Sequence, residues 1–277
     1  MTRASETVST PKEREMSQVR FECEGPVGSI VLNHPPQNRI GHQMMLDLTD
    51  AVAEASASDI RVLLVRGDGP DFCFGGDVRE WPDATPHGLR SFTSRVNAAF
   101  RAIELLPIPT VAVVQGAAYG GGFELALSCD LILAAESAHF RFIEATIAVP
   151  PLAGGVQRLA ERIGRSAAAR LVLLAQRVSA SELADLQVVA KVVADTELDD
   201  EAAALAAQLA SGPTRAHAAT KALLQAWATG GLATADRLMP DLVSHLFQTE
   251  DVAAGLDAAV TALKTGTKRP MLAFQGR

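Results

Sequence analysis

Two glutamates with apolar neighbours could carry acid–base chemistry in this chain. Glu124 lies in the largely apolar run 123–129, and Glu144 lies in the run 142–145. A carboxylate in such a setting is expensive to bury, so it must be paired, hydrogen-bonded or functional. Taken alone, Glu144 also fits a partly exposed residue at a strand end. The pair of acids is more informative than either acid alone.

Two glycine-containing loops could present main-chain N–H groups to an anion or to a developing oxyanion. The first, residues 72–77, reads Phe-Cys-Phe-Gly-Gly-Asp, and the second is the glycine triplet 120–122. Adjacent glycines let a ligand approach the backbone closely, and a helix that starts after glycines has unpaired N–H groups. A tight turn is the alternative reading of the first loop. The second is neither a P-loop nor a dinucleotide fingerprint, since the Lys-Ser or Lys-Thr pair and the spaced glycines are missing.

Other catalytic patterns are weak. The sequence has no glycine-flanked serine elbow and no two histidines at helical spacing, so we expect no metal site. Its three cysteines, Cys23, Cys73 and Cys129, are too few and too far apart for a disulfide framework or a zinc site. This cysteine usage predicts a reducing, cytoplasmic setting.

Composition predicts a folded globular protein. The chain has 277 residues, 48% hydrophobic and 21% charged, with a net charge of −7. An acidic balance argues against nucleic acid as a partner, and no apolar run approaches the roughly 18 residues of a membrane helix. Residues 1–17 are polar without an apolar core, so we expect a flexible N-terminal tail rather than a secretory signal.

Hydrophobic periodicity predicts strands that alternate with helices, followed by a helical region. The site loops fall where strands end and helices begin. We expect an α/β core over 18–210 and a helical C-terminal region over 211–277, with Glu250 and Asp251 capping the last helix. The expected strands are 19–23, 27–32, 62–65, 110–115 and 131–135, and the expected helical segments are 44–55, 92–103, 123–128, 156–163, 167–174, 181–186, 202–209, 218–227 and 252–263.

These motifs, in this order, closely resemble the enoyl-CoA hydratase/isomerase, or crotonase, superfamily. The resemblance implies a crotonase-like spiral of ββα units, a helical C-terminal trimerisation region, and a homotrimer or dimer of trimers. It also implies an acyl-CoA thioester substrate, with no cofactor besides the coenzyme A that is part of that substrate. The matching segments are 33–38, 72–77, 115–126, 129–130, 153–159, 268–270 and 274–277.

The resemblance also implies roles for individual residues. The amides of Phe74 and Gly121 match the two donors that hold the thioester oxygen. Glu144 matches the proton donor to the α-carbon, and Glu124 matches the acid that positions or activates water. The expected substrate-binding residues are Phe72, Phe74, Gly75, Gly76, Asp77, Gly120, Gly121 and Leu152.

Retention of both acids favours hydration of a 2-enoyl-CoA. The alternatives are an isomerase, hydrolase or lyase acting through the same thioester enolate, and a non-catalytic acyl-CoA-binding member. Phe74 and Leu152 lend weight to the last, because smaller residues are usual at both positions; leucine would also be strained if position 152 needs a positive φ. The final basic residues form either a solvated tail or a contact to the CoA phosphates; they are Lys264, Lys268, Arg269 and Arg277.

Overall fold

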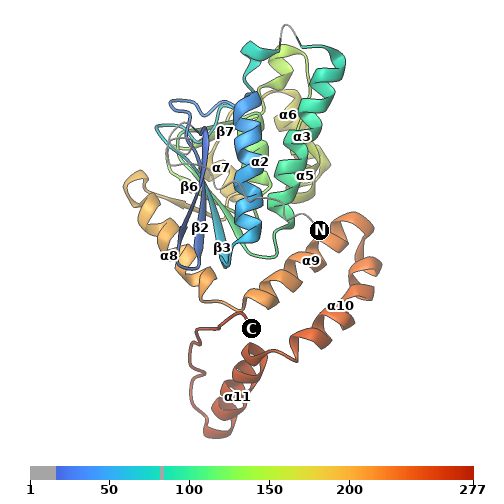
Figure 1. The fold of residues 1–277 in the computed structure, drawn as a ribbon. Helices are drawn as coiled ribbons and strands as arrows, with labels where there is room; N and C mark the ends of the chain where they lie inside the picture. Colours follow the sequence, from blue (N-terminus) through green and yellow to red (C-terminus); the bar gives the residue numbers. More distant parts are fainter. Residues whose placement is uncertain (1–16, 82–83) are drawn as a thin grey trace, which may run out of the picture.

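A six-stranded sheet forms the first layer of the molecule (Figure 1). The computed structural model describes residues 17–81 and 84–277, so the tail expected over 1–17 lies outside them except for Ser17. The first two strands pair antiparallel, and every later pairing in this sheet is parallel. In spatial order the strands are β1 (Val19–Glu24), β2 (Val27–Leu32), β3 (Val62–Gly67), β4 (Thr110–Val114), β6 (Leu131–Ala135) and β9 (Lys191–Val193).

A second, smaller sheet follows directly from the first. It consists of β5 (Ala117–Tyr119), β7 (His139–Arg141) and β8 (Val178–Ser179). The chain passes from β4 into β5 at Gly116, whose φ of 55° suits glycine. It then enters α4 (Gly121–Leu127), which completes a strand–strand–helix unit. Isolated bridges at Ile40–Gly76 and Cys73–Ala118 extend the same arrangement to earlier turns of the chain. The predicted spiral of ββα units is confirmed.

Helices cover both faces of the six-stranded sheet, with α2 and α8 on opposite sides in Figure 1. The apolar positions that predicted the first helix, Met44, Met45, Leu48, Val52 and Ala55, are all buried. The helices of the core are α2 (His42–Ala57), α3 (Pro86–Leu105), α5 (Gly155–Ile163), α6 (Arg165–Leu173), α7 (Ala180–Asp185) and α8 (Leu198–Ala210).

Three further helices form an arm that extends away from the two sheets (Figure 1). They are α9 (Thr214–Gly230), α10 (Leu232–Leu246) and α11 (Glu250–Thr265). Helix α10 was not predicted, and it carries Pro240 in its interior, a residue that usually ends a helix. None of the described helices is long and apolar enough to cross a membrane.

Two short strands and one helix cap differ from the prediction. Strands β8 and β9 were not predicted, because two or three residues are too short to show a strand periodicity. Helix α11 is capped by Thr249, whose Oγ1 accepts a hydrogen bond from Val252 N at 3.2 Å. Asp251 instead holds the C-terminal segment, because its buried carboxylate accepts from the amides of Gln275 at 2.7 Å and Gly276 at 2.8 Å.

Candidate active site

Both candidate acids line one small cavity between α3 and the two glycine-containing loops, 72–77 and 120–122. Its volume is about 40 Å³, and Gly76, Gly121 and Leu152 line it together with Glu124 and Glu144. The structure therefore brings together residues that are far apart in the chain. The sequence did not mark the rest of the wall as part of a site. Its apolar residues on α3 were predicted to be core, because an apolar stripe on a helix is typical of core packing. The rest of the wall consists of Ile40, Trp81, Phe92, Thr93, Val96 and Ala153.

Glu124 lies in the first turn of α4 and is only 2% exposed. Its Oε1 accepts two hydrogen bonds, from Ala153 N and Gly155 N, each at 2.8 Å. Burial raises the pKa of this carboxyl, while the amides and the charge of Arg158 oppose the rise. Position 155 must be glycine here, since a Cβ would lie 2.6 Å from Glu124 Cγ.

Glu144 faces the same cavity without such support. It begins the short 3₁₀ helix Glu144–Ile147, and its buried Oε2 has no hydrogen-bond partner among the described residues. Burial, reinforced by the nearby charge of Glu124, raises the pKa of Glu144 to about 7. A glycine at position 120 leaves room for it, because a Cβ there would lie 2.6 Å from Glu144 Oε1. Glu144 can thus carry a proton near neutral pH, whereas two amides favour the ionised form of Glu124.

The structure corrects the expected role of Phe74. Its amide N–H donates to Gln37 O at 2.9 Å, so it cannot also be an open donor to a ligand. Two residues later the backbone differs: Ile40 N donates to Gly75 O at 2.8 Å and Asp77 N donates to Ile40 O at 3.1 Å. These two hydrogen bonds pair Ile40 with Gly76 without using the N–H group of Gly76.

Gly76 and Gly121 both line the cavity. A Cβ built on Gly121 would lie 3.6 Å from Gly76 N, so the two backbones approach closely. Neither amide donates a hydrogen bond to another group in the described part of the chain. Gly121 opens helix α4, where N–H groups lack intrahelical acceptors. The pair can hold a carbonyl oxygen on which negative charge develops.

Five of the expected binding residues do not line the cavity: Gly120, described above, and four that support this backbone. Phe72 is fully buried in the core, and the ring of Phe74 packs 5.1 Å from that of Tyr119. Gly75, at φ 80°, lets the two loops touch, since a Cβ would lie 2.7 Å from Gly121 N. Asp77 caps a short helix by accepting from Arg79 N at 3.2 Å.

The strain considered for Leu152 does not arise, because its φ is not among the positive values of the described residues. Leu152 therefore needs no compensating distortion, and its side chain forms one wall of the cavity. Among these residues, no cluster of three His, Cys, Asp or Glu side chains is arranged to hold a metal ion.

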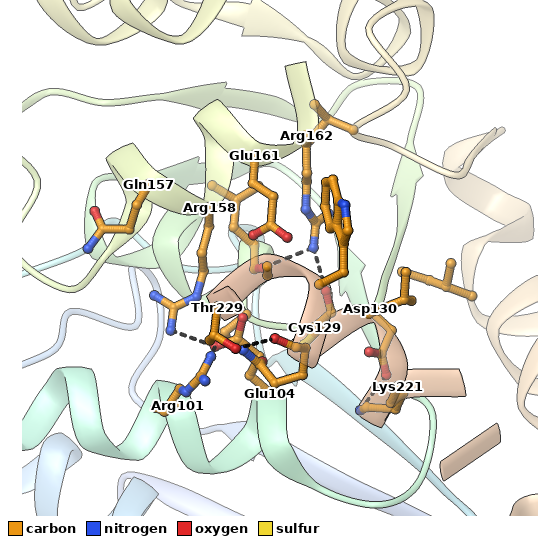
Figure 2. Close-up of a pocket in the computed structure, with 18 of the residues that line it drawn as sticks. Arg101, Glu104, Cys129, Asp130, Gln157, Arg158, Glu161, Arg162, Lys221 and Thr229 are labelled. Carbon is orange, nitrogen blue, oxygen red and sulfur yellow. Dashed lines mark hydrogen bonds and ion pairs between the residues drawn. The ribbon is translucent and has the colours of Figure 1, made fainter. Parts of the chain in front are cut away.

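A wider polar pocket of about 660 Å³ lies between the core and α9 (Figure 2). Arg101, Glu104, Arg158 and Arg162 line it, and none of the residues expected from the sequence to bind substrate does. Its walls carry both signs of charge. Arg101 and Arg158 pair with Glu104, and Lys221 pairs with Asp130. Arg162 donates to backbone carbonyls. This pocket adjoins the loop that holds Glu124, because Arg158 lines the pocket and donates to Ala153 O in that loop.

Comparison with known proteins agrees with this arrangement. The family model for enoyl-CoA hydratase/isomerase matches residues 22–265. Human mitochondrial methylglutaconyl-CoA hydratase is 34% identical over 170 residues, which are 61% of this chain and 50% of the relative. The chain thus aligns with about half the length of the curated relatives it matches.

Solved structures align over almost their whole length. Enoyl-CoA hydratase subunit I from Geobacillus kaustophilus is 32% identical with a TM-score of 0.83, covering 94% of this chain and 98% of that one. Enoyl-CoA hydratase from Bacillus anthracis is 28% identical, also with a TM-score of 0.83, covering 94% and 100%. From the match of the family model, together with these structures, the chain belongs to the enoyl-CoA hydratase/isomerase family.

Proposed function

We propose that this protein adds water across the double bond of a 2-enoyl-CoA thioester. The observation that carries the proposal is the pairing of two buried glutamates in unlike environments within one cavity. Two glycines whose amides have no acceptor among the described residues line the same cavity. Such a pair supplies a base and an acid at the same pH, and the amides supply a site for an oxyanion.

Each group has one task in the proposed reaction. Glu124 accepts a proton from water as the water oxygen bonds to the β-carbon. The electron pair of the double bond shifts toward the thioester carbonyl, whose oxygen accepts hydrogen bonds from the amides of Gly76 and Gly121. Glu144 then delivers its proton to the α-carbon, and the carbonyl re-forms. Removal of one such backbone donor typically costs on the order of 10² to 10³ in rate.

The test follows the absorbance of the conjugated thioester. Purified protein should consume a four-carbon 2-enoyl-CoA and form the 3-hydroxyacyl-CoA. An isomerase would instead conjugate a 3-enoyl-CoA without making the hydroxyacyl product, and a binding protein would bind both thioesters without turnover. Either outcome would overturn hydration as the function.

A bound acyl-CoA analogue should place its thioester oxygen between the amides of Gly76 and Gly121. We expect distances of about 2.7 to 3.1 Å to both nitrogens, because these are the unpaired donors. Phe74 N should remain bonded to Gln37 O. A crystal structure with a non-reactive thioester analogue makes the measurement, and an oxygen bonded to Phe74 N would contradict it.

The cavity walls predict a short, uncharged acyl group. Ile40, Trp81, Phe92 and Leu152 make the lining largely apolar, and no Lys, Arg or His lines it in the described part of the chain. A free carboxylate on the acyl chain would lose its hydration without gaining a cationic partner. We expect kcat/KM to fall on the order of 10² from crotonyl-CoA to 3-methylglutaconyl-CoA.

Leu152→Ala should allow this cavity to bind longer acyl chains. Removing the branched side chain frees room for about two or three carbons, so kcat/KM for eight-carbon relative to four-carbon substrate should rise about tenfold. Leu159→Ala, in a fully buried position that does not line the cavity, is the matched control for lost packing. An unchanged chain-length preference in Leu152→Ala would contradict the prediction.

We also propose that the chain assembles as a homotrimer or a dimer of trimers. The arm exposes large apolar side chains, including Leu224 at 60%, Phe247 at 64% and Leu263 at 84%. Clustered apolar surface of this kind is typical of subunit interfaces. Light scattering should give three or six times the 29.2 kDa chain mass, and a monomer at micromolar concentration would contradict the proposal.

A further inference from the structure

Arg158 lies behind Glu124 and touches the loop that holds it. It is the fourth residue of α5, and its side chain is 9% exposed. We propose that Arg158 is a positioning residue that holds the 153–155 backbone so that two of its amides grip Glu124 in the catalytic geometry. The inference rests on the proposed role of Glu124 in hydration.

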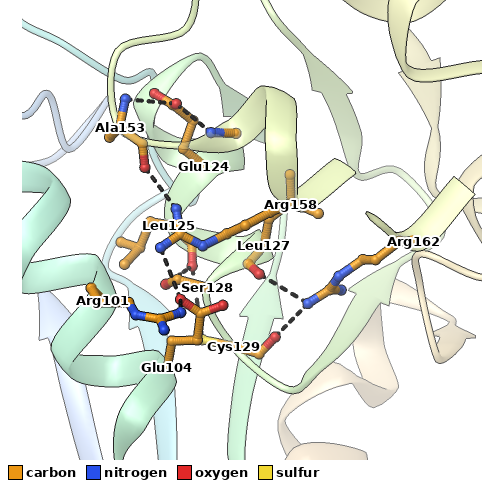
Figure 3. A network of polar contacts seen from close by, with 11 residues as sticks. Arg101, Glu104, Glu124, Leu125, Leu127, Ser128, Cys129, Ala153, Arg158 and Arg162 are labelled. Carbon is orange, nitrogen blue, oxygen red and sulfur yellow. Dashed lines mark hydrogen bonds and ion pairs between the residues drawn. The ribbon is translucent and has the colours of Figure 1, made fainter. Parts of the chain in front are cut away.

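Three consecutive peptide units carry the argument (Figure 3). The first gives Ala153 N–H to Glu124 Oε1, and the third gives Gly155 N–H to the same oxygen, each at 2.8 Å. The unit between them has its carbonyl, Ala153 O, bonded to Arg158 Nη1 at 2.8 Å. Fixing this middle carbonyl restricts the rotation of both neighbouring units. The direction of the two donated hydrogen bonds therefore depends on the guanidinium.

The local backbone is shaped around this contact. Gly154 adopts a φ of 90°, and a Cβ there would overlap Arg158 Nη1. The guanidinium thus lies directly against the peptide. Arg158 N also donates to Gly154 O at 3.2 Å, which anchors the third peptide unit to the start of the helix.

An anionic partner fixes the other end of the guanidinium. Arg158 Nη2 donates to Glu104 Oε2 at 3.0 Å, and Arg101 Nη1 donates to the same oxygen at 2.9 Å. Burial alone would raise the pKa of Glu104, but these two arginines lower it, so Glu104 is ionised at neutral pH. The ion-pair network of Arg101, Glu104 and Arg158 connects the wide polar pocket to the loop of the active site (Figure 2).

Arg158 stabilises the ionised form of Glu124 in two ways. Its positive charge lowers the pKa of Glu124, and it holds two amides that do the same, against the larger effect of burial. Glu144 has no such support. Losing Arg158 should therefore raise the pKa of Glu124 and favour its protonated form. The two carboxyls would then no longer act as one base and one acid.

The test is the double variant Arg158→Met/Glu104→Gln, which removes both charges of the buried pair and leaves a side-chain amide at position 104 that can still accept a hydrogen bond from Arg101. With a four-carbon 2-enoyl-CoA, kcat should fall at least about tenfold while KM stays within about twofold, since the substrate contacts remain. The acidic limb of the kcat/KM profile should move up by about one pH unit. Arg158→Lys, which keeps the charge but loses the fork geometry, should show a smaller fall in kcat with the fold intact.

Arg162→Met is the matched control. Arg162 lies one turn further along α5 and is partly buried, but it donates to Leu127 O at 2.9 Å and Cys129 O at 2.6 Å rather than to the loop. Its loss should lower stability without moving the pH profile. An equal shift in Arg162→Met, or wild-type kcat and profile in both Arg158 variants, would overturn the proposal.

A readout that needs no turnover separates this proposal from hydration itself. In a Glu144→Gln background, ¹³C NMR of labelled glutamate should show the Glu124 carboxyl titrating about one pH unit higher after Arg158→Met/Glu104→Gln. If the wild type does not hydrate enoyl-CoA but this shift occurs, the proposed function fails and the positioning role stands. An unshifted Glu124 overturns the positioning role whatever the activity.

Discussion

Glu144→Gln is expected to lower kcat for hydration of a four-carbon 2-enoyl-CoA by about 10² to 10⁴. Glutamine keeps the shape of the side chain but cannot deliver a proton to the α-carbon, and general acid catalysis contributes a factor of this size. KM should change little, because the thioester oxygen and the acyl group keep their contacts. Stopped-flow absorbance of the conjugated thioester gives both constants.

The pH dependence of the wild type tests the same role. Burial raises the pKa of Glu144 to about 7, so its protonated, donating form is depleted as pH rises above that value. The alkaline limb of kcat/KM should therefore fall through about pH 7 in the free enzyme. Glu136→Gln, at an exposed position between β6 and β7, is the control and should match wild type. A Glu144→Gln enzyme within twofold of wild-type kcat would remove Glu144 from the mechanism.

The same substitution is expected to stabilise the fold at pH 8. Because the folded-state pKa of Glu144 lies above the ordinary value of 4.5, the folded protein binds more protons than the unfolded chain between these values. The favourable contribution is complete below about pH 4.5 and is lost as pH rises through about 7. At pH 8 the buried charge lowers the free energy of unfolding by up to about 3 kcal/mol. Hydration of the carboxylate reduces this cost.

Urea unfolding at two pH values isolates this effect. Glu144→Gln should unfold at higher urea than wild type at pH 8, and the gain should shrink at pH 5, where Glu144 is mostly protonated in the folded state. Comparing one variant at two pH values cancels the change in packing caused by the amide. Glu136→Gln should show no pH-dependent gain. An equal difference at both pH values would show that Glu144 does not titrate near neutrality.

Together the two results would show that one residue serves activity and opposes stability. The cavity keeps Glu144 away from water and from hydrogen-bond donors, and this raises the energy of its ionised form. The same environment makes it a better proton donor near neutral pH. Loss of stability at an active site is expected where a group is held in an unfavourable state for its chemistry.

Long periodic elements of the fold were predictable from the sequence. Strand β2 and the helices α2 and α3 lie where apolar spacing placed them, because burial of one face imposes that spacing. Helix α10 was missed, since Pro240 breaks the local pattern while packing against α9 maintains the helix. Strands β5, β7 and β8 are two or three residues long and depend on pairing with distant segments.

The sequence by itself determined which residues could do the chemistry: two glutamates among apolar neighbours, and glycines where strands meet helices. Only the tertiary structure decided which backbone amide is available. Phe74 N donates a hydrogen bond to Gln37 O. Gly76 N has no such acceptor, because Ile40 bonds to the residues on either side of Gly76. The reason is physical: hydrogen bonds between segments more than thirty residues apart decide which donors remain for a ligand, as burial by distant walls decides the pKa of Glu144.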